Sequence, residues 1–290
     1  MPTPAQPAPE PSRANFQRFD EVADNFEFSD VALKPAERNA LALLADSIGE
    51  VDMLDLGVGA GRTGYTFAPL VRSYVGLDVA PRMIERARKL LKSDEKAELL
   101  VGDARNLSEL TSRPGFRGFD FILFSFNGLG AVGHEDRLKI LREVRRAIAP
   151  GGLFLFSSHS IGALPLNLKR PKPPHLRNSR LYRLIAPISE LRYAREARKS
   201  NQMLDLDAAR KQGWVIVRDP AHDFTLDVYY VDPSYQVEQL REVGFEVKAT
   251  YNIAGEEVTL PYAGRDPWLD YLCSPTDSPS EPESAVSISP

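Results

Sequence analysis

Three glycines at alternate positions, Gly57, Gly59 and Gly61, are the residues of this sequence best suited to hold a ligand. Glycine accepts positive φ angles and lets a ligand lie directly against the backbone. Asp55 stands two residues before the first glycine, where its charge would repel a pyrophosphate but would pair with a cationic ligand. The spacing G-x-G-x-G also differs from the G-x-G-x-x-G of dinucleotide-binding loops. On this pattern alone, a cationic cofactor and another nucleotide are both open.

Two more acids follow predicted strands and add candidate ligand-binding groups. Asp78 comes 17 residues after the last of these glycines and ends the strand predicted over 73–77. An ionised carboxylate accepts hydrogen bonds on both oxygens, which suits the two hydroxyls of a ribose. Asp78 could also cap the next helix, because Pro81 suits an early helical position, and the two roles are compatible. Asp103 follows the strand predicted over 97–101 and serves either a ligand or the turn itself.

Candidate catalytic groups lie further along the chain. His159 follows the strand predicted over 153–157 and would point toward the ligand-binding crevice, where a histidine could act as a general base. The alternative is a polar residue that satisfies a loop or contacts the substrate passively. Tyr230 is a weaker candidate base. His134 precedes a predicted helix, and we expect it near the start of that helix instead of at a catalytic centre.

The order of the predicted elements indicates the fold class. Short apolar runs alternate with amphipathic segments, which is typical of an α/β fold with a mostly parallel sheet. The run 119–127 is almost continuously apolar, which predicts a central strand buried on both faces, and its end should open into the ligand crevice. Strands are predicted over 51–56, 73–77, 97–101, 119–127, 153–157, 245–251 and 268–273, with an added hairpin of 214–218 and 224–231. Helices are predicted over 35–48, 63–71, 82–91, 136–148 and 234–243.

Two segments carry a family resemblance. LDLGVGAGR at 54–62 resembles the first motif of class I S-adenosylmethionine-dependent methyltransferases. REVRRAIAPGGLFLFSSHS at 142–160 resembles the segment of that family that contains L-K-P-G-G. The resemblance implies a Rossmann-like α/β fold with a seven-stranded, mostly parallel sheet in the order 3-2-1-4-5-7-6. It also implies helices on both faces, and here a cap is inserted after the fifth strand.

The resemblance further implies roles for individual residues in binding S-adenosylmethionine and its product, S-adenosylhomocysteine. Asp55 would lie near the cationic methionyl end, Asp78 on the ribose, and Asp103 with Ala104 on the adenine. The segment 16–28 resembles a family segment that folds over the cofactor as a lid; an amphipathic helix that covers the domain is the alternative. The cofactor-binding residues that we expect are Phe19, Phe26, Asp55, Gly57, Gly59, Gly61, Arg62, Asp78, Val79, Met83, Asp103, Ala104, Ser125, Phe126 and Asn127.

The remaining segments define the predicted domain organisation. Residues 1–12 and 274–290 are rich in proline and small or polar residues and are predicted to be disordered tails around a domain at 13–273. Within it, 160–231 is predicted to form a substrate cap that includes the added hairpin. The stretch 169–199 holds ten Lys or Arg against two acids. These cations either are solvated or attract an anionic ligand.

Composition limits the possible functions. The net charge is -4 with 43% hydrophobic and 26% charged residues, which carries no overall basic signature for nucleic acid. One cysteine, Cys273, excludes a disulfide framework and a cysteine-rich zinc site, and we expect no metal. No apolar run is long enough to span a membrane and no secretory signal is recognised, so a cytoplasmic location is expected. The oligomeric state is open.

The predicted reaction is methyl transfer from S-adenosylmethionine to a nitrogen or oxygen of a small molecule, and an anionic acceptor is one of the options that this prediction includes. Alignment of the reactants would supply most of the catalysis, because the sulfonium methyl is already activated. The sequence Ser125-Phe126-Asn127-Gly128 replaces the N/D-P-P-Y/W of base amino-methyltransferases, which argues against base N-methylation. One alternative is an RNA or protein methyltransferase that grips its partner with the basic insertion. The other is an NAD(P)-dependent oxidoreductase, which the glycine spacing and Asp55 disfavour.

Overall fold

The computed structural model describes residues 12–21, 31–92, 95–164, 195, 199–201, 204–219 and 224–276. Phe26 and most of the basic stretch 169–199 lie outside these residues. So do the two predicted tails, except for residue 12 of the first and residues 274–276 of the second. The helix α1 (Ser12–Glu21) occupies the first part of the segment that was predicted as a lid.

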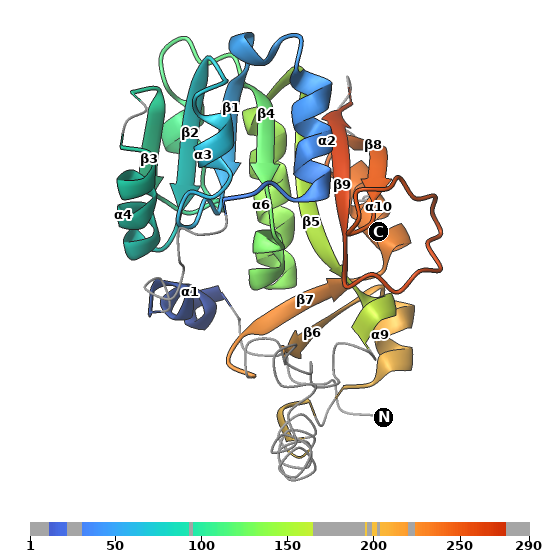
Figure 1. Cartoon of the computed structure of the whole chain (residues 1–290). Helices are drawn as coiled ribbons and strands as arrows, with labels where there is room; N and C mark the ends of the chain where they lie inside the picture. The colour runs from blue at the N-terminus through green and yellow to red at the C-terminus, as the bar shows by residue number, and fades with distance from the viewer. Residues whose placement is uncertain are drawn as a thin grey trace, which may run out of the picture.

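A mixed β-sheet forms the centre of the described molecule (Figure 1). Its parallel part consists of β1 (Asp52–Leu56), β2 (Ser73–Asp78), β3 (Ala97–Val101), β4 (Phe119–Phe124) and β5 (Ile148–Ser160) in the order β3-β2-β1-β4-β5. On the far side of β5, β9 (Trp268–Pro275) runs antiparallel to it, and β8 (Phe245–Tyr251) runs antiparallel to β9. With β8 as the sixth strand and β9 as the seventh, the predicted order 3-2-1-4-5-7-6 is confirmed.

The predicted hairpin extends this sheet at the end of β5. Its strands are β6 (Trp214–Arg218) and β7 (Asp227–Val231), which pair antiparallel. His159 of β5 pairs with Trp268 on one side and with Tyr230 of β7 on the other. Since β4 already ends opposite Phe156, β7 lies beside β5 beyond the end of β4. The hairpin therefore borders the carboxyl end of β4 (Figure 1).

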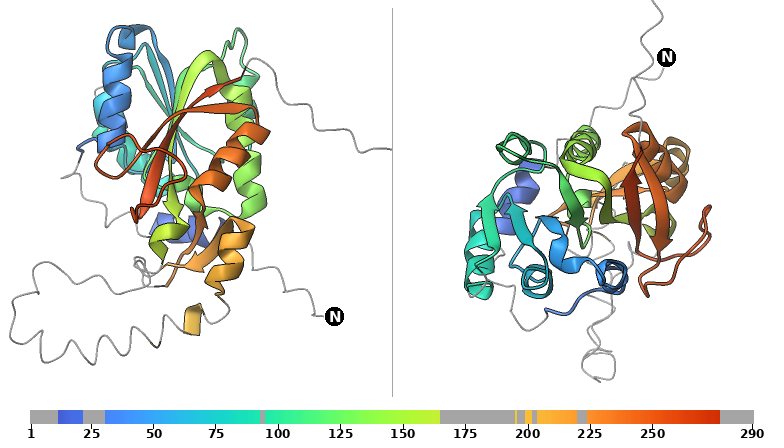
Figure 2. Two further views of the ribbon diagram at one scale, coloured as in Figure 1. Left: turned by 90° about the vertical axis from the view of Figure 1, so that its right-hand side faces the viewer. Right: turned by 90° about the horizontal axis from the view of Figure 1, so that it is seen from above.

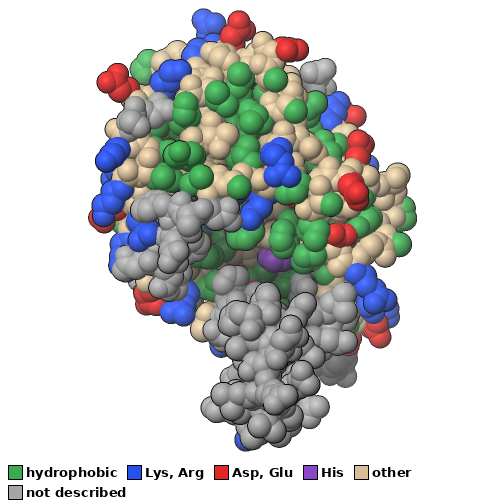
Figure 3. Space-filling model, in the orientation of Figure 1, with side chains coloured by type: hydrophobic (Ala, Val, Ile, Leu, Met, Phe, Trp, Pro, Cys, Tyr) green, Lys and Arg blue, Asp and Glu red, His purple; other side chains and the backbone are tan. Residues whose placement is uncertain are grey.

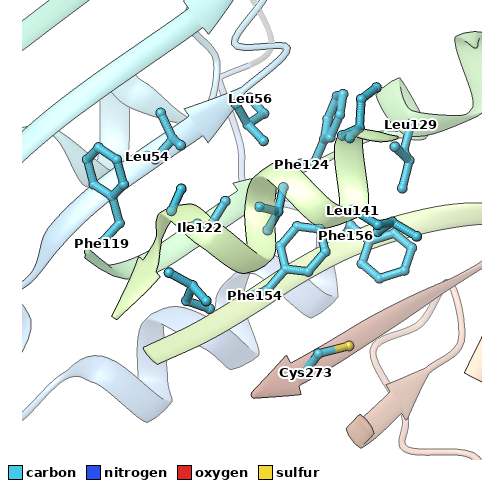
Figure 4. Packing of buried hydrophobic residues seen from close by; sticks show 14 of the residues in the cluster. Leu54, Leu56, Phe119, Ile122, Phe124, Leu129, Leu141, Phe154, Phe156 and Cys273 are labelled. Carbon is cyan, nitrogen blue, oxygen red and sulfur yellow. The ribbon is translucent and has the colours of Figure 1, made fainter. Parts of the chain in front are cut away.

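Helices cover both faces of the sheet (Figure 2). One face packs against α2 (Pro35–Leu44), α3 (Gly64–Phe67) and α4 (Pro81–Leu90), through a buried cluster that includes Ala40, Phe67, Ile84 and Leu155. The other face packs against α5 (Ser108–Thr111), α6 (His134–Ala147) and α10 (Pro233–Glu242). Figure 4 shows the core of this second face, where Phe154, Phe156 and Leu141 lie among the aliphatic side chains of β1 and β4.

Local chemistry explains where several elements begin. Pro35, Pro81 and Pro233 each take the first turn of a helix, where the missing N–H costs nothing. The carboxylate of Asp232 accepts hydrogen bonds from the N–H groups of Ser234 and Tyr235 and so caps α10. A short helix, α9 (Leu206–Gln212), precedes the hairpin and is capped in the same way by Asp205.

Two predicted boundaries were wrong near the site. The strand predicted over 119–127 ends at Phe124, because Phe126 and Asn127 adopt positive φ angles of 52° and 62° that no strand contains. The helix predicted over 63–71 is the four-residue α3. Both differences place irregular backbone at the carboxyl ends of β1 and β4, where a parallel sheet binds its ligands.

Candidate active site

The glycine loop after β1 presents bare backbone on its outer side. Gly57 has φ +63° and its added Cβ would stand 2.8 Å from the ring of Phe124, so only glycine fits there. Gly59 has φ +55°, and its added Cβ would meet no atom closer than the loop's own Gly57 carbonyl oxygen, 3.9 Å away. The backbone at Gly59 is therefore open on the side where a ligand would lie.

Asp78, at the end of β2, holds this loop in place. Its Oδ2 accepts a hydrogen bond of 2.8 Å from the N–H of Gly59, and its Oδ1 accepts one of 2.9 Å from the N–H of Ala80. Burial raises the pKa of Asp78, opposed by hydrogen bonds from backbone groups including that of Val79. The cap residue of α4 is Ala80, so Asp78 clamps the loop instead of capping the helix. Each carboxylate oxygen has a second lone pair that can accept from a ligand hydroxyl.

Asp55 lies beneath the loop and not on its open side. The side chain is 1% exposed, and Oδ2 accepts hydrogen bonds from the hydroxyls of Thr63 and Tyr74. Burial raises the pKa of Asp55 to about 6, although these two hydrogen bonds act in the opposite direction. Asp55 thus connects β1 to the residues that follow the loop. Its contact with a cationic methionyl group stays a prediction.

Asp103, after β3, is paired with an arginine. Both of its carboxylate oxygens accept hydrogen bonds from the guanidinium of Arg105, which also contacts Asp136 at 2.7 Å. Burial acts to raise the pKa of Asp103, but the hydrogen bonds and charge of Arg105 hold it below its ordinary value. Asp103 and Ala104 are both partly buried. Their role in adenine binding stays a prediction.

A buried glutamate that the sequence analysis missed connects the glycine loop to β4. Glu37 of α2 is 2% exposed and accepts hydrogen bonds of 2.5 and 2.7 Å from the guanidinium of Arg62, as well as one from the hydroxyl of Ser125. Arg62 also donates to Ser125 at 3.2 Å. Burial alone would raise the pKa of Glu37, but Arg62 and Ser125 hold it below its ordinary value. Arg62 and Ser125 therefore position each other through Glu37.

The turn after β4 projects an aromatic ring from a strained backbone. Phe126 is 57% exposed, and its ring meets that of Trp268 edge to face at a centroid distance of 6.0 Å. The ammonium group of Lys34 lies 5.0 Å from the same ring. The N–H of Asn127 donates to the hydroxyl of Ser157 at 2.6 Å, which fixes the turn against β5. Phe126 thus contacts Trp268 of β9, and its expected role in cofactor binding stays a prediction.

The helix α1 joins the cofactor side of the site to the hairpin. Phe19 packs both against the small apolar group of Ala80 and Met83 and against the buried cluster of the hairpin, which includes Tyr230. The carboxylate of Asp20 accepts a hydrogen bond of 2.9 Å from the N–H of Arg82 at the start of α4. This position agrees with that expected of a lid, whose closing function stays a prediction.

The two candidate bases differ in access. His159 is partly buried, with its ring 5.0 Å from that of Tyr230 and 6.5 Å from that of Trp268. Tyr230 is 1% exposed and its hydroxyl donates to Asp219 at 3.2 Å. Tyr230 was therefore a poor candidate base, because its hydroxyl is already bonded inside the hairpin. His134 is the first residue of α6, as predicted, and its ring stacks on that of Trp214 at 4.3 Å.

Comparisons with known proteins identify the family of this fold and loop. Residues 53–152, from β1 through the glycine loop into β5, match a family described as a methyltransferase domain. The chain is 26% identical over 206 residues to an uncharacterized methyltransferase, YcgJ, of Bacillus subtilis, and the match covers 67% of this chain and 78% of that protein. These matches support a class I S-adenosylmethionine-dependent methyltransferase, as the sequence resemblance implied. The oxidoreductase alternative is thereby set aside.

Solved structures agree on the fold of this methyltransferase. One is an S-adenosylmethionine-dependent methyltransferase from Clostridium acetobutylicum, with a TM-score of 0.58, 15% identity, and coverage of 90% of this chain and 99% of that chain. Another is the 1,6-didemethyltoxoflavin-N1-methyltransferase of Burkholderia thailandensis, with a TM-score of 0.56, 15% identity, and coverage of 96% and 95%. At this level of identity the likeness concerns the fold.

The residues of the methyltransferase fit its cofactor, S-adenosylmethionine. The open backbone at Gly59 and the carboxylate of Asp78 stand beside each other, as a ribose requires. The apolar side chains of Met83, Ala80 and Ala60, with Phe19 packed against them, give an adjacent apolar wall. Polar acceptors beside a small apolar surface suit a nucleoside.

The described residues of the methyltransferase were also expected to lack a membrane span and a metal site. None of the helices within the described ranges is long and apolar enough to cross a membrane. In those same residues, no group of three or more His, Cys, Asp or Glu side chains is arranged to hold a metal ion. Figure 3 shows Lys and Arg side chains scattered over the face that carries α2, and a hollow near its centre where a histidine is visible.

Proposed function

We propose that this methyltransferase acts on a nitrogen or oxygen of a small molecule. The observation that carries the proposal is the position of the hairpin. Its strand β7 pairs with β5 at His159 and Tyr230, past the last pair that β4 makes with β5 at Phe124 and Phe156. The hairpin therefore borders the space beside the 125–127 turn, which favours a small acceptor over an extended polymer.

Described residues would act mainly by binding and orienting the two reactants. When bound, S-adenosylmethionine supplies a methyl group on a positively charged sulfur, which leaves as a neutral thioether. Asp78 and the backbone at Gly59 would hold its ribose. The hydrogen bonds of Glu37 to Arg62 and to Ser125 would hold α2, the glycine loop and the turn after β4 in fixed positions relative to one another. Holding reactants in line lowers the barrier without a strong acid or base, and His159 stands ready to take a proton from a hydroxyl acceptor.

The alternative of an RNA or protein substrate receives less support. Its motivation was the basic stretch 169–199, which lies almost entirely outside the described residues. The net charge of -4 gives no overall attraction for a polyanion. RNA binding that weakens steeply as salt rises, with methyl transfer to that RNA, would instead favour this alternative.

Two experiments test the proposal in sequence. Calorimetry with S-adenosylhomocysteine should give a saturable one-to-one isotherm. The same protein, supplied with S-adenosylmethionine labelled in its methyl group, should then transfer the label to members of a panel of small amines and phenols. A failure of the chain to bind S-adenosylhomocysteine would reject the proposed cofactor site. Binding without transfer to any small molecule, together with transfer to RNA or protein, would reject the proposed acceptor class.

A further inference from the structure

Asp270 of β9 lies on the sheet face that carries α2, next to the turn after β4. Its neighbours along the strand, Leu269 and Tyr271, belong to the buried cluster on the α6 face, so Asp270 points the opposite way. In the sheet it pairs with Ser157 of β5, whose hydroxyl accepts the N–H of Asn127. Only β5 separates Asp270 from the 125–127 turn.

Among the residues that the structure describes, none donates a hydrogen bond to the carboxyl group of Asp270. It is partly buried, and within the described ranges it accepts no hydrogen bond and forms no ion pair. Burial, together with the negative charge of Glu37 on α2, raises its pKa to about 8. The oxygens of this carboxyl group are therefore available to a donor that a ligand supplies.

Two aromatic rings stand beside this carboxyl group. Trp268 is two residues before Asp270 on the same strand, so both side chains lie on the same face. Phe126 meets the Trp268 ring edge to face and is 57% exposed. The positive φ of 52° at Phe126 is costly for a residue with a side chain. Strain that places an aromatic ring in the open is a feature of binding sites.

We propose that Phe126, Trp268 and Asp270 form the binding subsite for the methyl acceptor, and that the acceptor is a planar ring bearing an N–H or O–H group. This inference rests on the proposed function and narrows its substrate class. The ring would pack on the exposed face of Phe126 and against Trp268, because stacked and edge-to-face rings attract each other. The N–H or O–H would donate a hydrogen bond to an oxygen of the Asp270 carboxyl group, which would hold the ring in place.

Three matched probes separate the two features of the acceptor. 3-Aminophenol has a planar ring and two donors, 1,3-dimethoxybenzene has the ring without a donor, and 3-aminocyclohexanol has the donors without a planar ring. Saturation-transfer NMR on the full chain with saturating S-adenosylhomocysteine would measure their affinities. We expect 3-aminophenol to bind at least about tenfold more tightly than either of the other probes. A tenfold change in affinity corresponds to the free energy of about one good hydrogen bond or ring contact.

Variants then assign the binding to this subsite. Asp270→Ala and Trp268→Leu should each weaken 3-aminophenol binding about tenfold, with the affinity for S-adenosylhomocysteine unchanged. Asp46→Asn, an exposed acid after α2, should change neither affinity. An unchanged affinity for S-adenosylhomocysteine also shows that each variant is folded. Should Asp270→Ala fail to fold, Asp270→Leu supplies a second test, since its side chain has a similar size and no hydrogen-bond acceptor.

Three outcomes would overturn the inference. The first is tight binding of S-adenosylhomocysteine without binding of 3-aminophenol, which leaves the proposed function standing and rejects the subsite alone. The second is equal binding of 3-aminocyclohexanol, which rejects the planar ring. The third is 3-aminophenol binding that neither variant changes. A failure to bind S-adenosylhomocysteine would be a different result, because it rejects the proposed function itself.

Discussion

The carboxylate of Asp78 accepts a hydrogen bond of 2.8 Å from the backbone N–H of Gly59. This contact joins the end of β2 to the glycine loop after β1, at the one loop position where an added side chain would meet open space. The acid therefore shapes the loop in addition to offering lone pairs to a ligand. A substitution at Asp78 should consequently act on cofactor binding through both effects.

Asp78→Ala should weaken the binding of S-adenosylhomocysteine by roughly 10- to 150-fold. This is the range expected when hydrogen bonds to a charged group are lost. Isothermal calorimetry on the wild-type chain and the variant measures it, with Asp46→Asn as the control. An unchanged dissociation constant in Asp78→Ala would contradict the ribose role.

Gly59→Ala should weaken cofactor binding more than folding. Alanine at φ +55° costs about 1 kcal/mol in stability, and its methyl group would occupy the open side of the loop. Gly115→Ala is the matched control, because Gly115 also has a positive φ, +77°, and open space around an added Cβ. Both variants should lose similar stability in urea unfolding, whereas only Gly59→Ala should bind S-adenosylhomocysteine weakly. Equal affinities in the two variants would show that the open side of Gly59 is not used.

Glu37→Gln should destabilise the chain by about 2 kcal/mol, because it removes the negative charge that pairs with Arg62 and replaces one of the two acceptor oxygens with an amide group that can only donate. The control is Glu98→Gln. Glu98 makes a similar two-bond pair with Arg113 at 2.7 and 2.8 Å, but both side chains are more than 40% exposed. An exposed pair contributes about 0 to 1 kcal/mol. Denaturant unfolding of both variants measures the difference, and equal losses would argue against the buried network.

The raised pKa of Asp270 predicts how stability depends on pH. In the folded chain, the carboxyl group of Asp270 keeps its proton up to about pH 8. In the unfolded chain, the same group releases its proton near pH 4. The contribution of this group to stability is therefore present at low pH and is lost as pH rises from 4 to 8. Asp270→Asn should remove this slope and melt higher than the wild type at pH 8, by roughly 2–4 °C for each kcal/mol.

Thermal melts of the wild type and of Asp270→Asn at pH 5 and pH 8 separate this effect from general changes. The difference between the two proteins should be larger at pH 8 than at pH 5. Asp46→Asn should track the wild type at both values, because Asp46 is exposed. A difference that stays constant between pH 5 and pH 8 would mean that Asp270 titrates normally.

Much of the fold could be predicted because its signals are local. Each strand of the parallel sheet is an apolar run, and proline or an acid precedes several of the helices. The β-strand order followed from a family resemblance in the glycine loop and in the turn before β5. The predicted strand 119–127 was too long for a physical reason: Phe126 continues the apolar pattern of the strand, and neither Phe126 nor Asn127, which adopt the left-handed conformation, is a glycine.

The site was predicted only where its residues are close in sequence. Asp55, Asp78 and the glycines come from one strand–loop–strand segment, and the structure brings them together around the loop. Glu37 was missed because its partners are distant: Arg62 is 25 residues away and Ser125 is 88 residues away. A glutamate in the first turn of a helix suggests only a local cap, which Glu37 also provides for Lys34 at 2.6 Å.

The sequence by itself therefore indicated the family and the loop proposed to hold the cofactor, since both depend on glycines and acids at fixed short spacings. The tertiary structure alone decided the surroundings of the proposed acceptor subsite. It buried the hydroxyl of Tyr230 against Asp219, turned Phe126 toward Trp268, and placed Asp270 on the same face as Trp268 without a donor among the described residues. The cause is the sheet, whose register places residues from distant parts of the chain on one face, so that their exposure and partners depend on folding.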